Sequence, residues 1–392
     1  MKKVGLITYH ATHNYGAVLQ AFATQYAVEK AGASCEIINF RPLSMKYFNS
    51  LYYAYPRGAP FKKDIKLVLG PLYRFMRNGH RHIQRVRWAK KLDCFVRGML
   101  KTTKEYTTCG ELDDAHFDYD IFITGSDQTW NIRCPLWALN RKRKHILDYS
   151  AAYFLGFVKS GKKASFAAST ANSTTEDLMP LKDLLEQYDY ITVRESLSKE
   201  RVEAVVHKPV HAVVDPTFLL TKQEWLAALG VAPAPVINEP YVLLYSLHWN
   251  KIIDTWVAAV KKFAQKRGLK VVCITPLAFK KFKEVIQIYD AGPLDFLNIY
   301  NNASYVFADS FHGVCFSIIF RKSFLALGNK YNPGDTRKES LLQVFNLESR
   351  IVENEDEINT YPAVDMNYQN SESTITETIE DSRTHLKRIL SL

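Results

Sequence analysis

The sequence has no long apolar run. Its 392 residues are 47% hydrophobic and 23% charged, yet no stretch approaches the ~18 uninterrupted apolar residues of a membrane-spanning helix. The first ten residues, MKKVGLITYH, hold too few apolar positions for the ~7–15-residue core of a signal peptide. We therefore expect an ordinary globular protein of the cytoplasm, with a chain long enough for two domains.

Paired cysteines are also lacking. The six cysteines are scattered along the chain, and no two of them form a C-x-x-C pair. This spacing suggests neither a disulfide framework nor a zinc site, and no closely spaced set of His, Cys, Asp and Glu suggests another metal. We expect reduced thiols and no bound metal.

Acidic residues are scarce between Arg57 and Lys104. This segment has fourteen Lys or Arg residues and two acids, a formal charge of +12, whereas the whole chain carries +11. Such a segment is either a solvated helical face or a contact for nucleic acid, an anionic membrane or a phosphorylated partner. No nucleic-acid module is visible, so we expect no nucleic-acid partner.

Strand-like and helix-like segments alternate in the first half of the chain. Residues 3–9 predict a strand, residues 18–30 a helix that ends before Gly32, and residues 35–40 a second strand. This β-α-β unit favours a parallel sheet. Further strands are expected at 119–124, 163–168, 190–193 and 210–214.

The second half repeats the pattern. Strands are expected at 241–247, 269–275, 305–308 and 323–327, and helices at 222–229, 251–267, 295–303 and 339–345. The predicted fold class is α/β, with two Rossmann-like, doubly wound domains. We expect an N-terminal domain over 1–230 with a basic helical insertion at about 45–110, a C-terminal domain over 231–370, and a tail over 371–392. The tail should be a polar linker and a helix that packs back on the first domain.

The most informative segment is Tyr305–Phe320, YVFADSFHGVCFSIIF. It predicts a strand, a turn capped by Asp309 and Ser310, and a buried helix. His312 and Gly313 then lie in the first helical turn, at the edge of the sheet where ligands bind in open α/β folds. Free N–H groups there attract phosphates and carboxylates. The alternative is a polar residue exposed at a helix start, without a function.

Two other strand-end loops carry polar residues. Asn14 and Tyr15 precede Gly16 after the first strand, in a loop that is neither a G-x-G-x-x-G fingerprint nor a Walker A loop. Ser126 and Asp127 follow a later strand, and Asp127 could act as a base. In both loops helix capping alone is the competing interpretation. Weaker candidates at another strand end are Arg194 and Glu195.

Arg337 and Lys338 open the last helix of the second domain. Positive charges at a helix start oppose the helix dipole, which hints at a nearby anion. A salt bridge in a loop is the alternative. Arg321 is a weaker candidate for binding an anion, because it lies at the far end of its helix, ~13 Å from His312.

Taken together, these segments resemble the polysaccharide pyruvyl transferase family. The HNYGA and DSFHG elements carry most of the resemblance, and the matching segments are 7–25, 119–131, 165–170, 190–195, 213–220, 309–320 and 335–347. The basic insertion at 45–110 and the tail fall outside it. The resemblance implies two Rossmann-like domains facing a cleft, as in GT-B glycosyltransferases.

The resemblance also implies an activity. It is the transfer of a pyruvyl group from phosphoenolpyruvate, the donor substrate, to a saccharide of a bacterial surface polymer, often linked to a lipid diphosphate. No cofactor is required. His312 would be the general acid or base, and Arg337 would bind phosphoenolpyruvate together with Ser310 and the N–H groups near Gly313.

In this interpretation the facing domain binds or orients donor and acceptor. It would do so through Asn14, Tyr15, Ser126 and Asp127, with Arg194 and Glu195 in support.

Two other functions fit the same fold. One is a nucleotide-sugar glycosyltransferase. Thermal shifts measured with nucleotide sugars and with phosphoenolpyruvate would distinguish it from a pyruvyl transferase. The other is a non-enzymatic saccharide-binding homologue.

We further hypothesise that residues 57–104 contact a lipid-diphosphate acceptor or the anionic inner face of a membrane, because the segment is strongly basic. Charge reversal there should weaken vesicle binding and activity on a lipid-linked acceptor. Unchanged binding and activity would contradict this hypothesis.

Overall fold

The chain folds into two compact units in the computed structural model. The first unit comprises Met1–Gly79, Phe95–Leu219 and Thr378–Leu392, and the second comprises His80–Cys94 and Leu220–Glu377. The structure describes residues 1–42, 45, 83–134, 151–232, 234–247, 251–275, 281–328, 336–361 and 366–392. Most of the predicted basic insertion, residues 46–82, lies outside this range, and residues 83–99 form a helix.

The first unit is built on parallel strands. Its main sheet has the order β2-β1-β3-β4, with β1 (Lys3–Ile7), β2 (Ser34–Ile37), β3 (Ile121–Thr124) and β4 (Lys162–Ser165). A second parallel pair consists of β5 (Ile191–Val193) and β6 (Val210–Ala212). Isolated bridges join β5 to the edge of β4, at Ala164–Tyr190 and Ala168–Val193. The chain therefore continues the parallel order beyond β4.

The first helix, α1 (Tyr15–Lys30), follows β1 directly. It starts three residues before the predicted position, because the Asn14 side chain accepts hydrogen bonds from the N–H groups of Gly16 and Ala17 (2.9 and 3.4 Å). It ends at Lys30, as predicted, where Gly32 takes a positive φ of 90°. Further helices of this unit include α4 (Cys109–Asp113), α6 (Thr175–Leu178), η1 (Met179–Leu181), α7 (Lys182–Leu185), α8 (Ser196–Glu203) and η2 (Pro216–Leu219).

The second unit has a single parallel sheet in the order β12-β11-β10-β7-β8-β9. Four of its strands were predicted: β7 (Tyr241–Tyr245), β8 (Lys270–Ile274), β10 (Tyr305–Ala308) and β11 (Ser323–Leu327). The sequence analysis missed the two edge strands, β9 (Ile286–Ile288) and β12 (Ile351–Val352). They are too short to show a pattern of their own.

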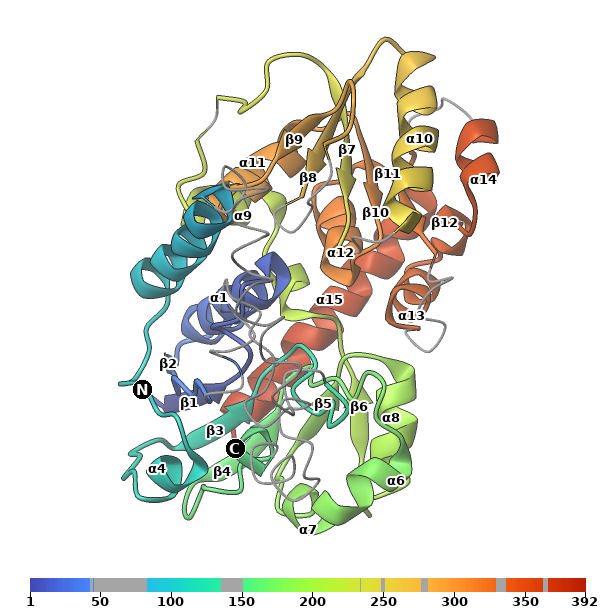
Figure 1. Ribbon diagram of the computed structural model, residues 1–392. Helices are drawn as coiled ribbons and strands as arrows, with labels where there is room; N and C mark the ends of the chain where they lie inside the picture. Colours follow the sequence, from blue (N-terminus) through green and yellow to red (C-terminus); the bar gives the residue numbers. More distant parts are fainter. Residues whose placement is uncertain are drawn as a thin grey trace, which may run out of the picture. The chain divides into compact units, whose positions relative to one another are not determined.

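Helices cover both faces of this sheet (Figure 1). Val242 and Leu244 of β7 share one apolar cluster with α10 (Lys251–Gln265) and α14 (Glu355–Thr360). Tyr245 points to the other face, where its ring contacts Phe296 of α11 (Pro293–Asn302), and α12 (Phe311–Ile319) lies on the same side. The remaining elements are α9 (Lys222–Ala228), α13 (Arg337–Val344), η3 (Glu348–Arg350) and α15 (Gln369–Leu390). The predicted fold class, α/β with two doubly wound units, is confirmed.

Each sheet has a point where its strand order reverses. In the first unit this switch point lies between β1 and β3, and in the second it lies between β7 and β10. Ligands of open α/β sheets bind outside the carboxyl ends of the strands at such points. The loops after these four strands are therefore the places to look for a site.

Two predicted boundaries need correction. The first unit ends at Leu219 rather than near residue 230, because α9 packs its Trp225 ring against Phe316 of α12 (5.3 Å between centroids). The stretch 371–381 is not a linker but belongs to the long helix α15. Its apolar face is interrupted by small polar residues such as Ser382, which is fully buried, and this hid the helical pattern.

The segment Thr378–Leu392, which includes the last part of α15, belongs to the first unit. The Ser382 hydroxyl accepts a hydrogen bond from the N–H of Val214 (3.0 Å). The His385 ring lies 4.6 Å from the His211 ring, and its Nδ1 is 2.7 Å from the Tyr190 hydroxyl. None of the helices in the described part of the chain is both long and apolar enough to cross a bilayer.

This histidine pair makes the attachment of α15 sensitive to acid. Burial, aided by Lys199 and Arg388, lowers the pKa of His211, and burial also lowers the pKa of His385, against the opposing effect of Asp381. In the unfolded chain both histidines have a pKa near 6.5. As the pH falls below that value, the unfolded chain therefore binds more protons than the folded chain. Folding stability should therefore decrease from about pH 6.5 downward.

We expect the double variant His211→Phe, His385→Gln to lose less stability than the parent between pH 7.5 and 5.5. The melting temperatures of the parent and the variant are measured at both pH values. The change in melting temperature between the two pH values is compared, because the substitutions themselves alter its absolute value. An identical pH-dependent drop in parent and variant would contradict the role of the pair.

Candidate functional site

The switch point of the second unit is organised by Asp309, the residue after β10. Its carboxylate accepts hydrogen bonds from the Ser246 hydroxyl and from the N–H of Leu247 (2.9 Å), both in the chain that follows β7. Asp309 thus joins the carboxyl ends of the two strands that flank the switch point. Asp309 was predicted from the sequence to cap a helix. In the structure its position between the two strands lets it connect them instead.

Ser310 is the N-cap residue of α12 by backbone geometry, but its side chain makes no capping hydrogen bond. The predicted side-chain cap is therefore wrong. Gly313 has a packing role in the first turn. A Cβ atom there would lie 2.8 Å from the Tyr245 ring, 2.9 Å from the Ala308 Cβ and 3.0 Å from the Tyr300 hydroxyl. Only glycine lets the start of α12 approach the sheet this closely.

His312 lies beside Phe311 in the first turn of α12, and both side chains are buried, each 7% exposed. The two rings form an edge-to-face pair with centroids 5.2 Å apart and planes at 83°. The guanidinium of Arg337, the first residue of α13, lies 5.9 Å from the centroid of the Phe311 ring. The structure thus gathers His312, Phe311 and Arg337 into one cluster at the switch point.

Arg321 is placed elsewhere. Its guanidinium makes two hydrogen bonds to the Glu372 carboxylate (2.9 and 2.6 Å) and one to the carbonyl of Ile318 (2.6 Å). Of the two arginines considered from the sequence, only Arg337 is adjacent to Phe311.

Lys338 was not predicted as a site residue, although it is a buried lysine in the same helical turn as Arg337. Its side chain is 3% exposed, and its ammonium donates a hydrogen bond to the carbonyl of Leu327, the last residue of β11. The signal that could have found it is the pair of positive charges at a helix start.

The carboxyl edge of the first unit's strands contains a buried arginine, at the end of β5. The guanidinium of Arg194 lies 2.9 Å from a carboxylate oxygen of Asp215, 3.4 Å from Glu195 and 3.9 Å from Asp127. Burial alone would lower the pKa of Arg194, but these carboxylates outweigh it and raise the pKa above its ordinary value. Arg194 is therefore a permanent charge that holds three strand-end acids together.

Hydroxyl groups complete this network. Ser126 donates a hydrogen bond to Asp215 (3.0 Å), and Ser169 donates one to Glu195 (2.5 Å). The Thr8 hydroxyl, after β1, donates to the carbonyl of Ser126 (2.9 Å). Asp215 and Ser169 were not among the candidates predicted from the sequence, because no sequence spacing joins them to Arg194.

The backbone at this edge is unusual. Asp127 has a φ of 68° and Ala167 a φ of 57°, values in the left-handed region that residues other than glycine rarely adopt. Aspartate tolerates this conformation better than alanine does. Such departures concentrate at functional sites, where the surrounding structure holds them in place. They support a functional role for the loop after β3.

The loop after β1 differs from its prediction. Asn14 is the N-cap of α1, so its amide oxygen is occupied by backbone N–H groups. Tyr15 is only 1% exposed, because as the first residue of α1 it points into the interior, and its predicted contact with substrate is not supported. His10 is also buried, which lowers its pKa to about 4 and keeps it neutral at pH 7.

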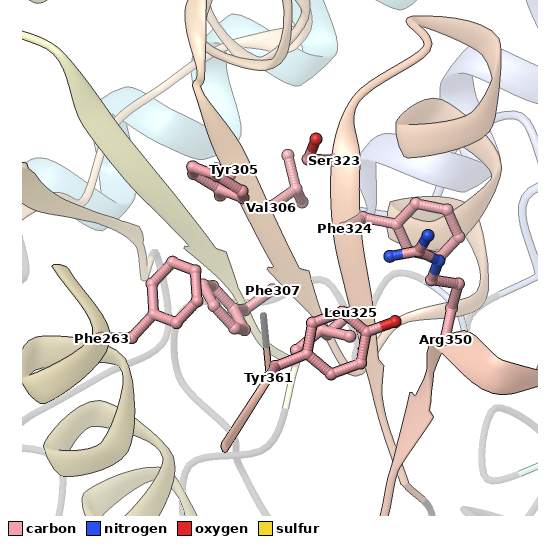
Figure 2. A pocket seen from close by; sticks show the side chains of 9 residues that line it. All are labelled: Phe263, Tyr305, Val306, Phe307, Ser323, Phe324, Leu325, Arg350 and Tyr361. Atoms are coloured by element: carbon pink, nitrogen blue, oxygen red, sulfur yellow. The ribbon is translucent and has the colours of Figure 1, made fainter. Parts of the chain in front are cut away.

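A small aromatic pocket, with a cavity volume of about 10 Å³, lies away from these clusters (Figure 2). Phe263 of α10 contributes to it, together with residues from the amino-terminal parts of β10 and β11. It therefore opens on the α10 face of the sheet, whereas α12 covers the opposite face. We do not assign it to the reaction. Within the described ranges, no group of three or more His, Cys, Asp or Glu side chains could hold a metal ion.

Comparison with known proteins identifies the family. A family model described as "Polysaccharide pyruvyl transferase" matches residues 14–331, which is most of the chain. The chain belongs to the polysaccharide pyruvyl transferase family. The DSFHG segment and its His312 lie inside the matched range, as do Asp127 and Arg194. No curated protein matches the chain significantly in sequence.

Solved structures resemble this pyruvyl transferase family member at low sequence identity. A UDP-GlcNAc 2-epimerase from Methanocaldococcus jannaschii is 13% identical, with a TM-score of 0.45, over 97% of this chain and 99% of the other. The E. coli heptosyltransferase WaaC with ADP is 14% identical, with a TM-score of 0.38, over 85% of this chain and 89% of the other. At these TM-scores the likenesses carry no information on substrate.

The Arg194 network yields a prediction on stability. Arg194→Met should lower the free energy of unfolding by about 3–5 kcal/mol, because it leaves several carboxylates buried without their cation. Arg133→Met, which removes a half-exposed ion pair with Asp177 in the same unit, should cost about 1 kcal/mol or less. Urea denaturation of both variants measures the difference. Equal losses would show that Arg194 does not hold the network.

Proposed function

We propose that this protein transfers a pyruvyl group from phosphoenolpyruvate to a saccharide, forming a cyclic ketal and releasing phosphate. Membership of the pyruvyl transferase family supports a transferase acting on saccharides. The observation that carries the proposal is the cluster of His312, Phe311 and Arg337 at the switch point of the second unit. It combines a group able to move protons with a fixed positive charge.

The chemistry requires three events. A proton adds to the methylene carbon of phosphoenolpyruvate, and the adjacent carbon becomes cation-like. One sugar hydroxyl attacks that carbon and loses its proton, forming the first carbon–oxygen bond. A second hydroxyl then forms the other carbon–oxygen bond as the bond from that carbon to the phosphate oxygen breaks, and the proton of this hydroxyl leaves with the phosphate. The reaction therefore needs an acid, a base near the hydroxyls, and positive groups for the carboxylate and phosphate.

His312 is proposed as the general acid. Imidazole is suited to proton transfer near neutral pH, and burial excludes competing water from the ring. The residue lies at the amino end of α12, where the helix dipole favours an anionic substrate. The edge-to-face contact with Phe311 restricts the ring to a defined orientation.

Arg337 is proposed to bind the carboxylate or phosphate of phosphoenolpyruvate. A guanidinium binds either group with two parallel hydrogen bonds. The N-terminal N–H groups of α12, around Ser310 and Gly313, would add further donors, since the Ser310 side chain makes no capping hydrogen bond. These groups supply the charge stabilisation, so the proposal needs neither a metal nor a redox cofactor.

Asp127 and Asn14 are proposed to bind or orient the saccharide, because both side chains are partly exposed at the switch point of the first unit. Carboxylates and amides suit sugar hydroxyls, and Asp127 would accept the proton of the attacking hydroxyl. Ser126, Arg194 and Glu195 are buried, so they would act by holding this edge in shape rather than by touching the sugar. A lipid-diphosphate anchor on the saccharide remains part of the proposal.

His312→Ala should lower the rate of phosphate release from phosphoenolpyruvate in the presence of a saccharide acceptor by about 10²–10⁴-fold, the usual loss of a general acid. His116→Ala, an exposed histidine of the first unit, is the matched control and should leave the rate unchanged. Phosphate release followed with lipid-linked and nitrophenyl sugars measures both. Full turnover by the His312 variant would remove the proposed mechanism.

A further inference from the structure

We propose that Phe311 is a positioning residue that holds both His312 and Arg337 in place for the reaction. The inference rests on the proposed function, and no catalytic role for the phenyl ring itself is involved. Phe311 is the first residue of α12, next in sequence to the acid and next in space to the cation. In the contacts described for this site, the Phe311 ring contacts both the His312 ring and the Arg337 guanidinium.

The geometry supports two distinct contacts. The Phe311 and His312 rings meet edge to face at 83°, the arrangement that aromatic quadrupoles favour. The Arg337 guanidinium lies 5.9 Å from the Phe311 centroid, within the range of a cation–π interaction. The ring is 7% exposed, so water competes little with either contact.

The contact between the Arg337 guanidinium and the Phe311 ring offsets the unfavourable position of Arg337 in its helix. A positive side chain at the start of a helix is disfavoured by the helix dipole, so the first turn of α13 is an unfavourable position for Arg337. The electron-rich face of Phe311 offers a compensating attraction. The same ring limits the rotation of His312, and small misplacements of a catalytic group are known to reduce rates strongly.

Phe320, at the other end of α12, provides a matched control. It is buried like Phe311, and its ring lies 5.9 Å from the Lys222 ammonium, so it also makes a cation–π contact. The contacts described for Phe320 include neither His312 nor Arg337. Its truncation should therefore disturb the packing of α12 without disturbing the cluster.

Phe311→Leu should lower kcat/KM for phosphoenolpyruvate by about 10–100-fold, through a lower kcat and a higher KM. Phe311→Tyr keeps the ring and should restore most of this loss. Phe320→Leu should lower the melting temperature while kcat and KM stay near the parent values. Equal kinetic effects of Phe311→Leu and Phe320→Leu would overturn the inference, because they would indicate a packing role only.

A double-mutant cycle separates the two contacts. In an Arg337→Ala background, Phe311→Leu should no longer raise the KM for phosphoenolpyruvate, although it should still lower kcat. A further rise in KM equal to that in the parent would show that Phe311 does not act through Arg337.

The inference can be tested apart from turnover. In nuclear magnetic resonance spectra of histidine side chains, the His312 signal is assigned by its loss in His312→Asn. Phe311→Leu should shift this signal, because the neighbouring ring is removed, and Phe320→Leu should leave it in place. An unmoved signal in Phe311→Leu contradicts positioning, whereas a shifted signal in a protein that releases no phosphate contradicts only the proposed reaction.

Discussion

The structure of the first unit depends on one constraint, that a charge removed from water must be matched by opposite charge. Arg194 satisfies it with the carboxylates of Asp215, Glu195 and Asp127, which come from three different strand ends. The guanidinium therefore links the carboxyl ends of β3, β5 and β6. It also explains how Asp127 is kept in its left-handed backbone conformation, partly exposed at that edge.

In the second unit a buried carboxylate is matched by hydrogen-bond donors instead of by a cation. Asp309 ties the chain after β7 to the chain after β10, and the start of α12 is thereby held against the sheet, with Gly313 allowing the close approach. Phe311 then brings the imidazole of His312 and the guanidinium of Arg337 together. The proposed chemistry rests on this arrangement, since an imidazole and a guanidinium lie at the edge where a parallel sheet binds ligands.

Much of the fold was predictable, because parallel strands buried on both faces leave continuous apolar runs such as Tyr241–Tyr245. The placement of His312 at a strand end followed from the same pattern. Long-range partners were not predictable: nothing in the sequence near Arg194 indicates that Asp215 lies 2.9 Å away. The burial of Tyr15 and the helical state of residues 371–381 were also missed, since both depend on tertiary packing rather than on local pattern.

The central claim is that phosphoenolpyruvate is protonated at its methylene carbon and becomes the ketal carbon of a saccharide. The most direct measurement is the mass and proton spectrum of the saccharide product formed in D₂O from unlabelled phosphoenolpyruvate. The account predicts one deuterium in the methyl group of each transferred pyruvyl, with one phosphate released per transfer. A product whose pyruvyl methyl carries no deuterium, or a product formed from a nucleotide sugar without consumption of phosphoenolpyruvate, would contradict it.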